Sequence, residues 1–141
     1  MKKLISVMLS LMLCFSLSAP ASAAAVQGGT AQPYYEKARE ATSVLSISGT
    51  KATCESMLRG KSDVTKIVAN QYLQKEGILW IWSTYDGAEW TKTVNSSSLS
   101  MTNTKSGLTD GKYRLKTVFI LTDSQGETET ITVYSDEKTV G

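Results

Sequence analysis

The stretch KYRLKTVFILTDSQGETETITVYS, residues 112–135, decides the fold class. On both sides of a short turn, β-branched and aromatic residues alternate with polar ones, which is typical of two paired strands with one buried face each. Phe119 and Ile131 must then share the buried face. A three-residue loop ending at Gly126 places them opposite each other, whereas a two- or four-residue loop does not. Asp123 before this loop and Gly126 at its end fit a type I turn with a glycine bulge.

Similar strand-like segments recur about every ten residues, separated by Gly, Asp and Ser. This spacing fits a two-sheet sandwich or a small barrel, and we predict the sandwich. The expected fold is all-β, a single antiparallel two-sheet sandwich with about seven or eight strands and no disulfide. The expected strands are Ser43–Ser48, Lys51–Arg59, Thr65–Lys75, Ile78–Tyr85, Ala88–Asn95, Lys112–Thr122 and Glu127–Ser135, with a short eighth at Ser98–Asn103.

The segment around Tyr113 gives this sandwich an immunoglobulin-like character. Tyr113 follows a turn at Gly111 and lies two residues before Leu115, the spacing of a tyrosine corner. Leu115 then occupies a position where antibody domains have a cysteine. Cys54 lies in the second strand, where the partner cysteine would be. The pattern therefore predicts a sandwich held by packing, with Cys54 buried and unpaired.

A second hairpin is expected at Asp86-Gly87, a strong two-residue type I′ turn signal. That turn would pair Ser83 with Trp90 and direct Trp90 inward. Trp80 and Trp82 would then lie on the opposite face, beside threonines and a glutamate. A slip of one residue would reverse every assignment.

These aromatic residues are the candidate binding site. Alternate residues on a strand project on one side about 7 Å apart. Trp80 and Trp82, with Tyr85, could therefore form an aromatic surface for a sugar or a protein partner. The alternative is that another segment, such as the Tyr34-Tyr35 lead-in, covers them.

Several segments also resemble small exported proteins of Gram-positive bacteria with immunoglobulin-like β-sandwiches. The likeness covers roughly residues 43–140 and implies a fold and a compartment, without a particular activity. The stretch from Leu79 to Trp90 departs from the Ser-rich hairpin usual there. The segments that carry the resemblance are 45–48, 52–54, 64–67, 73–75, 93–98, 113–117 and 130–135.

The first 23 residues have the order of a secretory signal peptide. Lys2 and Lys3 precede a mostly apolar run, and Ala21-Ser22-Ala23 forms an A-x-A cleavage site. The run is shorter than the roughly 20 residues of a membrane span. Cys14 is preceded by a large residue, unlike a lipid-attachment cysteine. We expect a signal peptide over 1–23, a flexible leader over 24–42 and a β-sandwich domain over 43–141. The mature protein would be secreted, without a membrane partner.

Composition excludes several functions. The 15 basic residues fall to 13 without Lys2 and Lys3, equal to the 13 acidic ones, so nucleic acid is not an expected partner. The chain has no histidine, which excludes His-based triads and His-ligated metals. No calcium-loop spacing is present, and we expect no metal or cofactor. We expect no catalytic residues. The sequence therefore favours a non-catalytic binding or interaction module outside the cell.

The competing class is a small secreted hydrolase, such as a glycosidase, that uses paired carboxylates. Glu127 and Glu129 share a strand face, and Glu36 and Glu40 could share a helical one. Neither pair lies in an apolar setting that would raise a pKa, so solvated surface groups are the preferred interpretation.

The signal-peptide assignment predicts the N-terminus of exported protein. Mass spectrometry of culture supernatant should find Ala24, or a residue within two positions of it, at the N-terminus. Full-length or lipid-modified chain in the membrane fraction would contradict this prediction.

Overall fold

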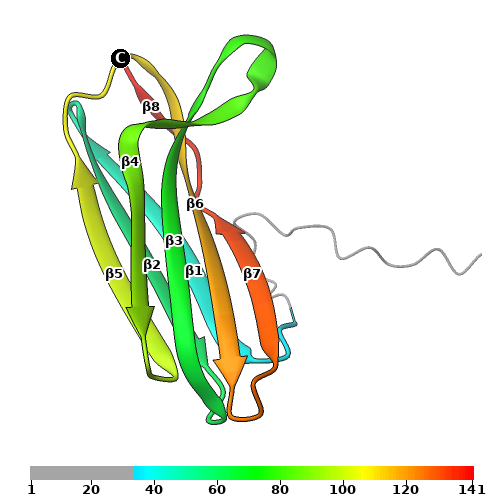
Figure 1. Cartoon of the computed structure of the whole chain (residues 1–141). Coiled ribbons are helices and arrows are strands. Elements are labelled where there is room, and N and C mark those ends of the chain that lie inside the picture. Colours follow the sequence, from blue (N-terminus) through cyan, green and yellow to red (C-terminus); the bar gives the residue numbers. More distant parts are fainter. Residues whose placement is uncertain (1–33) are drawn as a thin grey trace, which may run out of the picture.

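The computed structural model describes residues 34–141, which form two packed antiparallel β-sheets (Figure 1). The first sheet has the order β1-β2-β5, and the second has the order β4-β3-β6-β7, with β8 paired to β6. The expected all-β sandwich without a disulfide is confirmed. The strands are β1 (Ala38–Ser48), β2 (Lys51–Gly60), β3 (Val64–Glu76), β4 (Trp82–Val94), β5 (Ser98–Lys105), β6 (Gly111–Asp123), β7 (Thr128–Tyr134) and β8 (Lys138–Val140).

The β6–β7 hairpin has the predicted register. Phe119 pairs with Ile131, and both are buried. The loop is closed by the Asp123 N–H, which donates to the Glu127 carbonyl at 2.9 Å, and by the Gly126 N–H, which donates to the Asp123 carbonyl at 3.0 Å. Gly126 has a φ of 82°, the left-handed conformation that a glycine bulge requires. The three-residue loop is therefore confirmed.

The tyrosine corner is also present. The Tyr113 hydroxyl donates a hydrogen bond of 2.6 Å to the Thr109 carbonyl, four residues upstream. Tyr113 and Leu115 are fully buried. Cys54 has no disulfide partner and lies with Leu115 in one apolar cluster, as the sequence predicted.

A layer of polar side chains separates this cluster from a second apolar cluster around Leu58, Ile67 and Phe119. The layer contains Gln71 and Thr117, both fully buried. Its hydrogen bonds cross from one sheet to the other, so they fix how the sheets face each other. They join Ser43 Oγ to Thr117 Oγ1 (2.9 Å), Ser56 Oγ to Thr117 Oγ1 (2.8 Å), Gln71 Nε2 to Ser56 Oγ (2.6 Å) and Asn103 Nδ2 to Gln71 Oε1 (2.8 Å).

The expected hairpin at Asp86-Gly87 is wrong, and with it the pairing of Ser83 with Trp90. Strand β4 runs through these residues without turning. Its pairing with β3 shifts there, because residues 85–88 of β4 lie opposite Leu73 alone. Gly87 has a φ of 72°, so it takes the left-handed conformation of a Gly-containing bulge instead of that of a hairpin turn. The chain reverses at residues 77–81, between Glu76 and Trp82, which pair.

The N-terminal boundary also differs from the expectation. β1 begins at Ala38, so residues 38–42 are strand, although we predicted a flexible leader over 24–42. The predicted signal peptide and the first part of the leader lie outside the described residues. The short strand β8 (Lys138–Val140) was not predicted. Within residues 34–141, no helix is long and apolar enough to span a membrane.

The burial of Cys54 yields a stability prediction. Burial raises the pKa of its thiol to about 12, so almost no thiolate forms at neutral pH. Cys54→Ser should lower the free energy of unfolding by about 1–3 kcal/mol, because it puts a hydroxyl into an apolar cluster. Urea unfolding measures this effect, with Cys54→Ala as the control that adds no polar atom. Rapid labelling of Cys54 by a thiol reagent in the native state would contradict the assignment.

Candidate functional site

The β3–β4 hairpin projects beyond both sheets and ends in a tight turn (Figure 1). The Ile81 N–H donates to the Ile78 carbonyl at 3.3 Å, and the Gly77 N–H donates to the Ile81 carbonyl at 2.8 Å. Leu79 and Trp80 stand at the two central positions with φ values of 61° and 59°. Positive φ at both central residues is the property of a type I′ turn.

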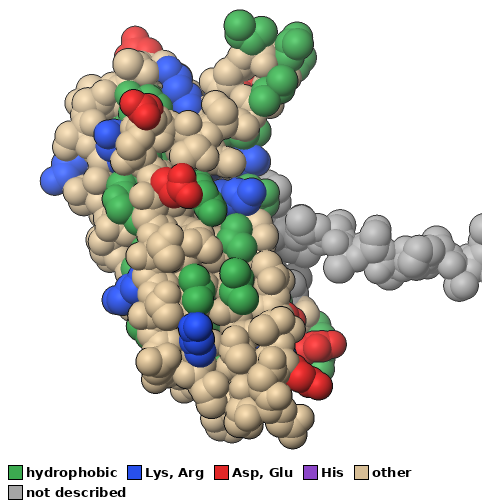
Figure 2. Space-filling model, in the orientation of Figure 1, with side chains coloured by type: hydrophobic (Ala, Val, Ile, Leu, Met, Phe, Trp, Pro, Cys, Tyr) green, Lys and Arg blue, Asp and Glu red, His purple; other side chains and the backbone are tan. Residues whose placement is uncertain are grey.

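Four consecutive side chains on this turn are apolar and exposed. Figure 2 shows hydrophobic side chains gathered on the projecting end of the molecule. We call these four residues the apolar tip. Exposed apolar patches on soluble domains commonly mark interaction sites. The exposed fractions are 85% for Ile78, 74% for Leu79, 78% for Trp80 and 63% for Ile81.

The backbone of the apolar tip is strained for the residues it carries. Left-handed conformations are rare outside Gly, Asn and Asp because the Cβ atom crowds the following carbonyl. Leu79 and Trp80 both adopt this conformation, although Asn-Gly would fit it at lower cost. Neither side chain is buried, so packing of the core does not explain them. Strain of this kind at an exposed apolar turn points to a function.

The base of the hairpin is held by a stack of aromatic and cationic side chains on the outer face of the second sheet. The Arg114 guanidinium lies 4.4 Å from the Trp82 ring centre and 4.3 Å from that of Tyr134. Its Nε donates to Gln74 Oε1 at 2.8 Å. Cation–π contacts of this kind contribute about 0.5–2 kcal/mol each, depending on their exposure. The stack couples β4, β3, β6 and β7 next to the apolar tip.

The predicted site residues are therefore not brought together. Trp80 lies in the apolar tip, but Trp82 is half-buried beneath Arg114. The Tyr85 hydroxyl donates to the Gly107 carbonyl at 3.2 Å, and its ring packs edge-on against Tyr113 at 5.6 Å. Sequence reasoning missed Ile78, Leu79 and Ile81, which it assigned to a strand. The available signal was the run of large apolar residues directly after Gly77.

Trp90 lies elsewhere, along a cleft of about 470 Å³ between β4 and β5. It is half-buried and packs against both apolar clusters, which agrees with its predicted inward orientation. The cleft wall is mostly polar, and Lys92 Nζ beside it donates to the Ser100 carbonyl at 2.7 Å. The lining residues are Glu89, Trp90, Thr91, Lys92, Met101, Thr102 and Asn103.

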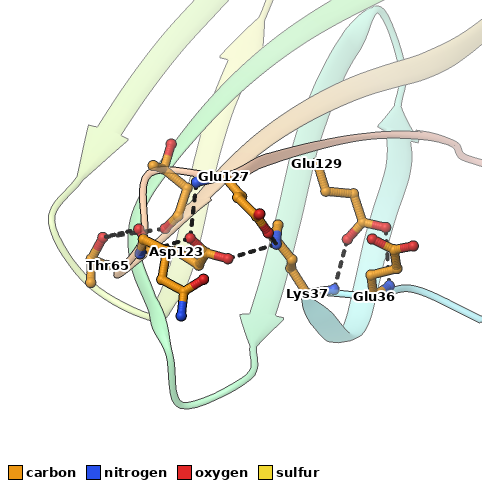
Figure 3. Close-up of polar contacts among 8 residues, drawn as sticks. Glu36, Lys37, Thr65, Asp123, Glu127 and Glu129 are labelled. Carbon is orange, nitrogen blue, oxygen red and sulfur yellow. Dashed lines mark hydrogen bonds and ion pairs between the residues drawn. The ribbon is translucent and has the colours of Figure 1, made fainter.

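Three of the four carboxylates considered for a hydrolase, those of Glu40, Glu127 and Glu129, contact neighbouring groups, and Figure 3 shows Glu127 and Glu129. Glu129 accepts hydrogen bonds from the backbone N–H groups of Glu36 and Lys37, at 3.0 and 2.8 Å. Glu127 lies 3.8 Å from Lys37 Nζ, and Glu40 lies 3.6 Å from Arg59. No group of three or more His, Cys, Asp or Glu residues that could hold a metal occurs within residues 34–141.

Lys37 and Asp123 form an ion pair that attaches the N-terminal segment to the β6–β7 turn. Lys37 Nζ lies 2.8 Å from Asp123 Oδ2, and both side chains are almost covered. Asp123 Oδ1 accepts the N–H groups of Gln125 and Glu127, each at 2.9 Å. The hydrogen bond from Lys37 lowers the pKa of Asp123, and the same bond raises the pKa of Lys37. This pair links the start of β1 to the opposite sheet.

Comparison with known proteins identifies no family. No protein-family model matches the chain, and no curated protein matches it. Two crystal structures of wild-type OgpA from Akkermansia muciniphila are distant structural neighbours. The first is 18% identical, covers 73% of this chain and 30% of that chain, and has a TM-score of 0.41. The second is 16% identical, covers 81% of this chain and 33% of that chain, and has a TM-score of 0.40. The aligned part of this chain spans about a third of OgpA.

The ion pair predicts how stability depends on pH. Because the pKa of Asp123 is lowered in the folded state, its ionised carboxylate stabilises the fold. This stabilisation is fully present above the unfolded-state pKa, about 4, and is lost as the pH falls through the lower folded-state pKa. Asp123→Asn should therefore be less stable than wild type at pH 7. The difference should shrink as the pH falls below about 4.

Urea unfolding at several pH values measures this difference. Glu127→Gln is the matched control, because its carboxylate is 71% exposed and 3.8 Å from the same amine. It should change the profile little. Parallel profiles for Asp123→Asn and wild type between pH 7 and pH 2 would contradict the prediction.

Proposed function

We propose that this protein is a secreted, non-catalytic binding module that makes its contact through the apolar tip. The observation that carries the proposal is the exposure of four consecutive large apolar residues, Ile78 to Ile81, on a projecting turn. Among residues 34–141, the other large apolar side chains with high exposure are Tyr34 and Val44, which are not part of this group. Isolated exposed apolar residues are ordinary on a protein surface, whereas a contiguous group favours an interaction site.

The compartment in this proposal rests on the sequence. Residues 1–23 have the charged start, apolar run and A-x-A site of an export signal. A secreted chain meets cell envelopes, glycans and other exported proteins, so its partner belongs to one of these classes. The unpaired Cys54 is compatible with an oxidising compartment, because it is buried and is not exposed as a free thiol.

The shape of the hairpin favours binding over a role in folding. The Trp82–Arg114–Tyr134 stack fixes the base of the hairpin, and the turn closes on its own backbone hydrogen bonds. The apolar tip is therefore held in one arrangement before any partner arrives. A preorganised contact loses less conformational entropy on binding than a flexible loop does.

No specific observation favours the alternative hydrolase. Glu129 and Asp123 accept backbone hydrogen bonds, and Glu127 lies beside Lys37. The cleft between β4 and β5 contains a single carboxylate, that of Glu89, whereas hydrolysis by paired acids needs two. We therefore propose no catalytic step.

The proposal is tested by a variant that keeps the turn and removes its side chains. Leu79→Asn combined with Trp80→Gly installs the preferred residues of a type I′ turn. Because these residues relieve backbone strain, the free energy of unfolding should stay unchanged or rise by up to about 2 kcal/mol. Binding should fall at least about tenfold, because two large apolar contacts are lost.

Binding is measured for the mature chain against cell-wall sacculi, a glycan array and lipid vesicles. Val44→Ser is the matched control, because it removes an exposed apolar side chain from β1 and leaves the hairpin unchanged. It should bind like wild type. Absence of both self-association and binding to any of the three surfaces would contradict the proposal, and so would binding that the double variant retains.

A further inference from the structure

We propose that the surface bound by the apolar tip is the interfacial region of a lipid bilayer with uncharged or zwitterionic headgroups. This inference rests on the proposed function and departs from our expectation that the mature protein has no membrane partner. The four side chains of the tip, Ile78 to Ile81, contain one hydrogen-bonding group, the indole N–H of Trp80. Aliphatic residues beside a tryptophan suit the boundary between headgroups and acyl chains.

The shape of the apolar tip fits a bilayer better than a glycan or a groove on another protein copy. The tip is a projection, as Figures 1 and 2 show, and a bilayer needs no complementary cavity to receive it. A sugar site pairs an aromatic ring with polar side chains, but Trp80 has only apolar neighbours within the tip. If two copies of the chain associated, the tip of one could enter the cleft between β4 and β5 of the other. That cleft has a mostly polar lining, which does not match the apolar tip.

The backbone of the turn is suited to partial insertion. Backbone groups that enter an apolar medium need internal hydrogen-bond partners. The N–H of Gly77 and the N–H of Ile81 both have such partners, the carbonyls of Ile81 and Ile78. The groups at the apex depend on water, so the tip reaches only the depth at which water is still present. Interfacial segments bury their apolar side chains about 5–10 Å deep, which is the depth of a single turn.

The charges near the base of the hairpin decide the lipid type. Lys112 Nζ lies 3.8 Å from Glu76 and 4.0 Å from Glu137, so these charges offset one another. Lys75 Nζ donates to Thr109 Oγ1 at 2.7 Å and faces the ring of Tyr113. The apolar tip itself contains no basic residue, unlike the polybasic segments that draw proteins to anionic lipids. Binding should therefore depend on apolar contact and change little with salt.

The Lys37–Asp123 pair and the start of β1 lie at the end of the sandwich away from the hairpin (Figures 1 and 3). A bilayer could therefore approach the apolar tip without meeting this end of the sandwich. With four inserted side chains, binding should be weak and reversible, as it is for a single lipid anchor.

The experiment is flotation of the mature chain with phosphatidylcholine vesicles, and in parallel with vesicles that contain an anionic lipid, at low and high salt. Wild type should float with the vesicles at both salt concentrations. Leu79→Asn with Trp80→Gly should reduce the bound fraction at least about tenfold at equal lipid concentration. Val44→Ser should bind like wild type, and thermal unfolding should show that every variant is folded.

A second readout locates the insertion. Lipids brominated near the headgroup should quench tryptophan fluorescence in wild type. Trp80→Phe should still float, because phenylalanine preserves the apolar contact, but should lose most of the quenching. Trp82 and Trp90 remain in that variant. Trp82 is half-buried beneath Arg114, and Trp90 lines the cleft between β4 and β5, so both are less accessible to the lipids than Trp80 is.

The outcomes separate this inference from the proposed function. Tip-dependent binding to a glycan or to cell-wall sacculi without flotation would overturn the lipid assignment and preserve the binding module. If wild type self-associates without floating, and the double variant does not self-associate, the lipid assignment is likewise overturned and the binding module is preserved. Flotation only with anionic vesicles and only at low salt would also overturn the assignment to uncharged or zwitterionic lipid. Flotation that the double variant retains would overturn both proposals.

Discussion

The pairing of β3 with β4 beyond the bulge is the constraint on which the candidate site depends. Glu76 faces Trp82, and Lys75 faces Ser83, so the two strands continue as a ribbon past the end of the sandwich. Arg114 stacks on Trp82 and holds this ribbon against the sheet. With both strands fixed, five residues remain to reverse the chain, and four of them, Ile78 to Ile81, are large and apolar. Their exposure follows from the register.

The rest of the molecule supplies a rigid base for that ribbon. The sheets carry no disulfide, and a buried hydrogen-bonded layer through Gln71 and Thr117 aligns them instead. Such a layer specifies one arrangement of the sheets, because any shift leaves buried polar groups without partners. Buried side-chain polar atoms within residues 34–141 all have partners. The Lys37–Asp123 pair closes the other end of the sandwich.

Local sequence predicted the parts of the fold in which pattern and turn chemistry agree. The β6–β7 loop, the tyrosine corner and the burial of Cys54 were all predicted correctly, because each depends on neighbouring residues. The β3–β4 hairpin was predicted wrongly, because the Asp86-Gly87 pair suits a hairpin turn and a bulge equally well. Gly87 has a φ of 72°, and a positive φ is compatible with either structure. The pairing of β4 with β3 on both sides of these residues, Gln74 with Thr84 and Tyr72 with Glu89, decides for the bulge, and that pairing is a tertiary effect. The true turn at Leu79-Trp80 has neither Gly nor Asn, so it carried no turn signal.

The sequence left open whether Trp80 is exposed or covered by another segment. Trp80 is exposed, but it was named as a candidate from a register that the structure contradicts. The most direct test of the account is therefore the register of this hairpin, measured by backbone nuclear Overhauser contacts in the mature chain. Cross-strand contacts are expected between Lys75 and Ser83 and between Glu76 and Trp82. Contacts between Ser83 and Trp90, as a turn at Asp86-Gly87 requires, would contradict it.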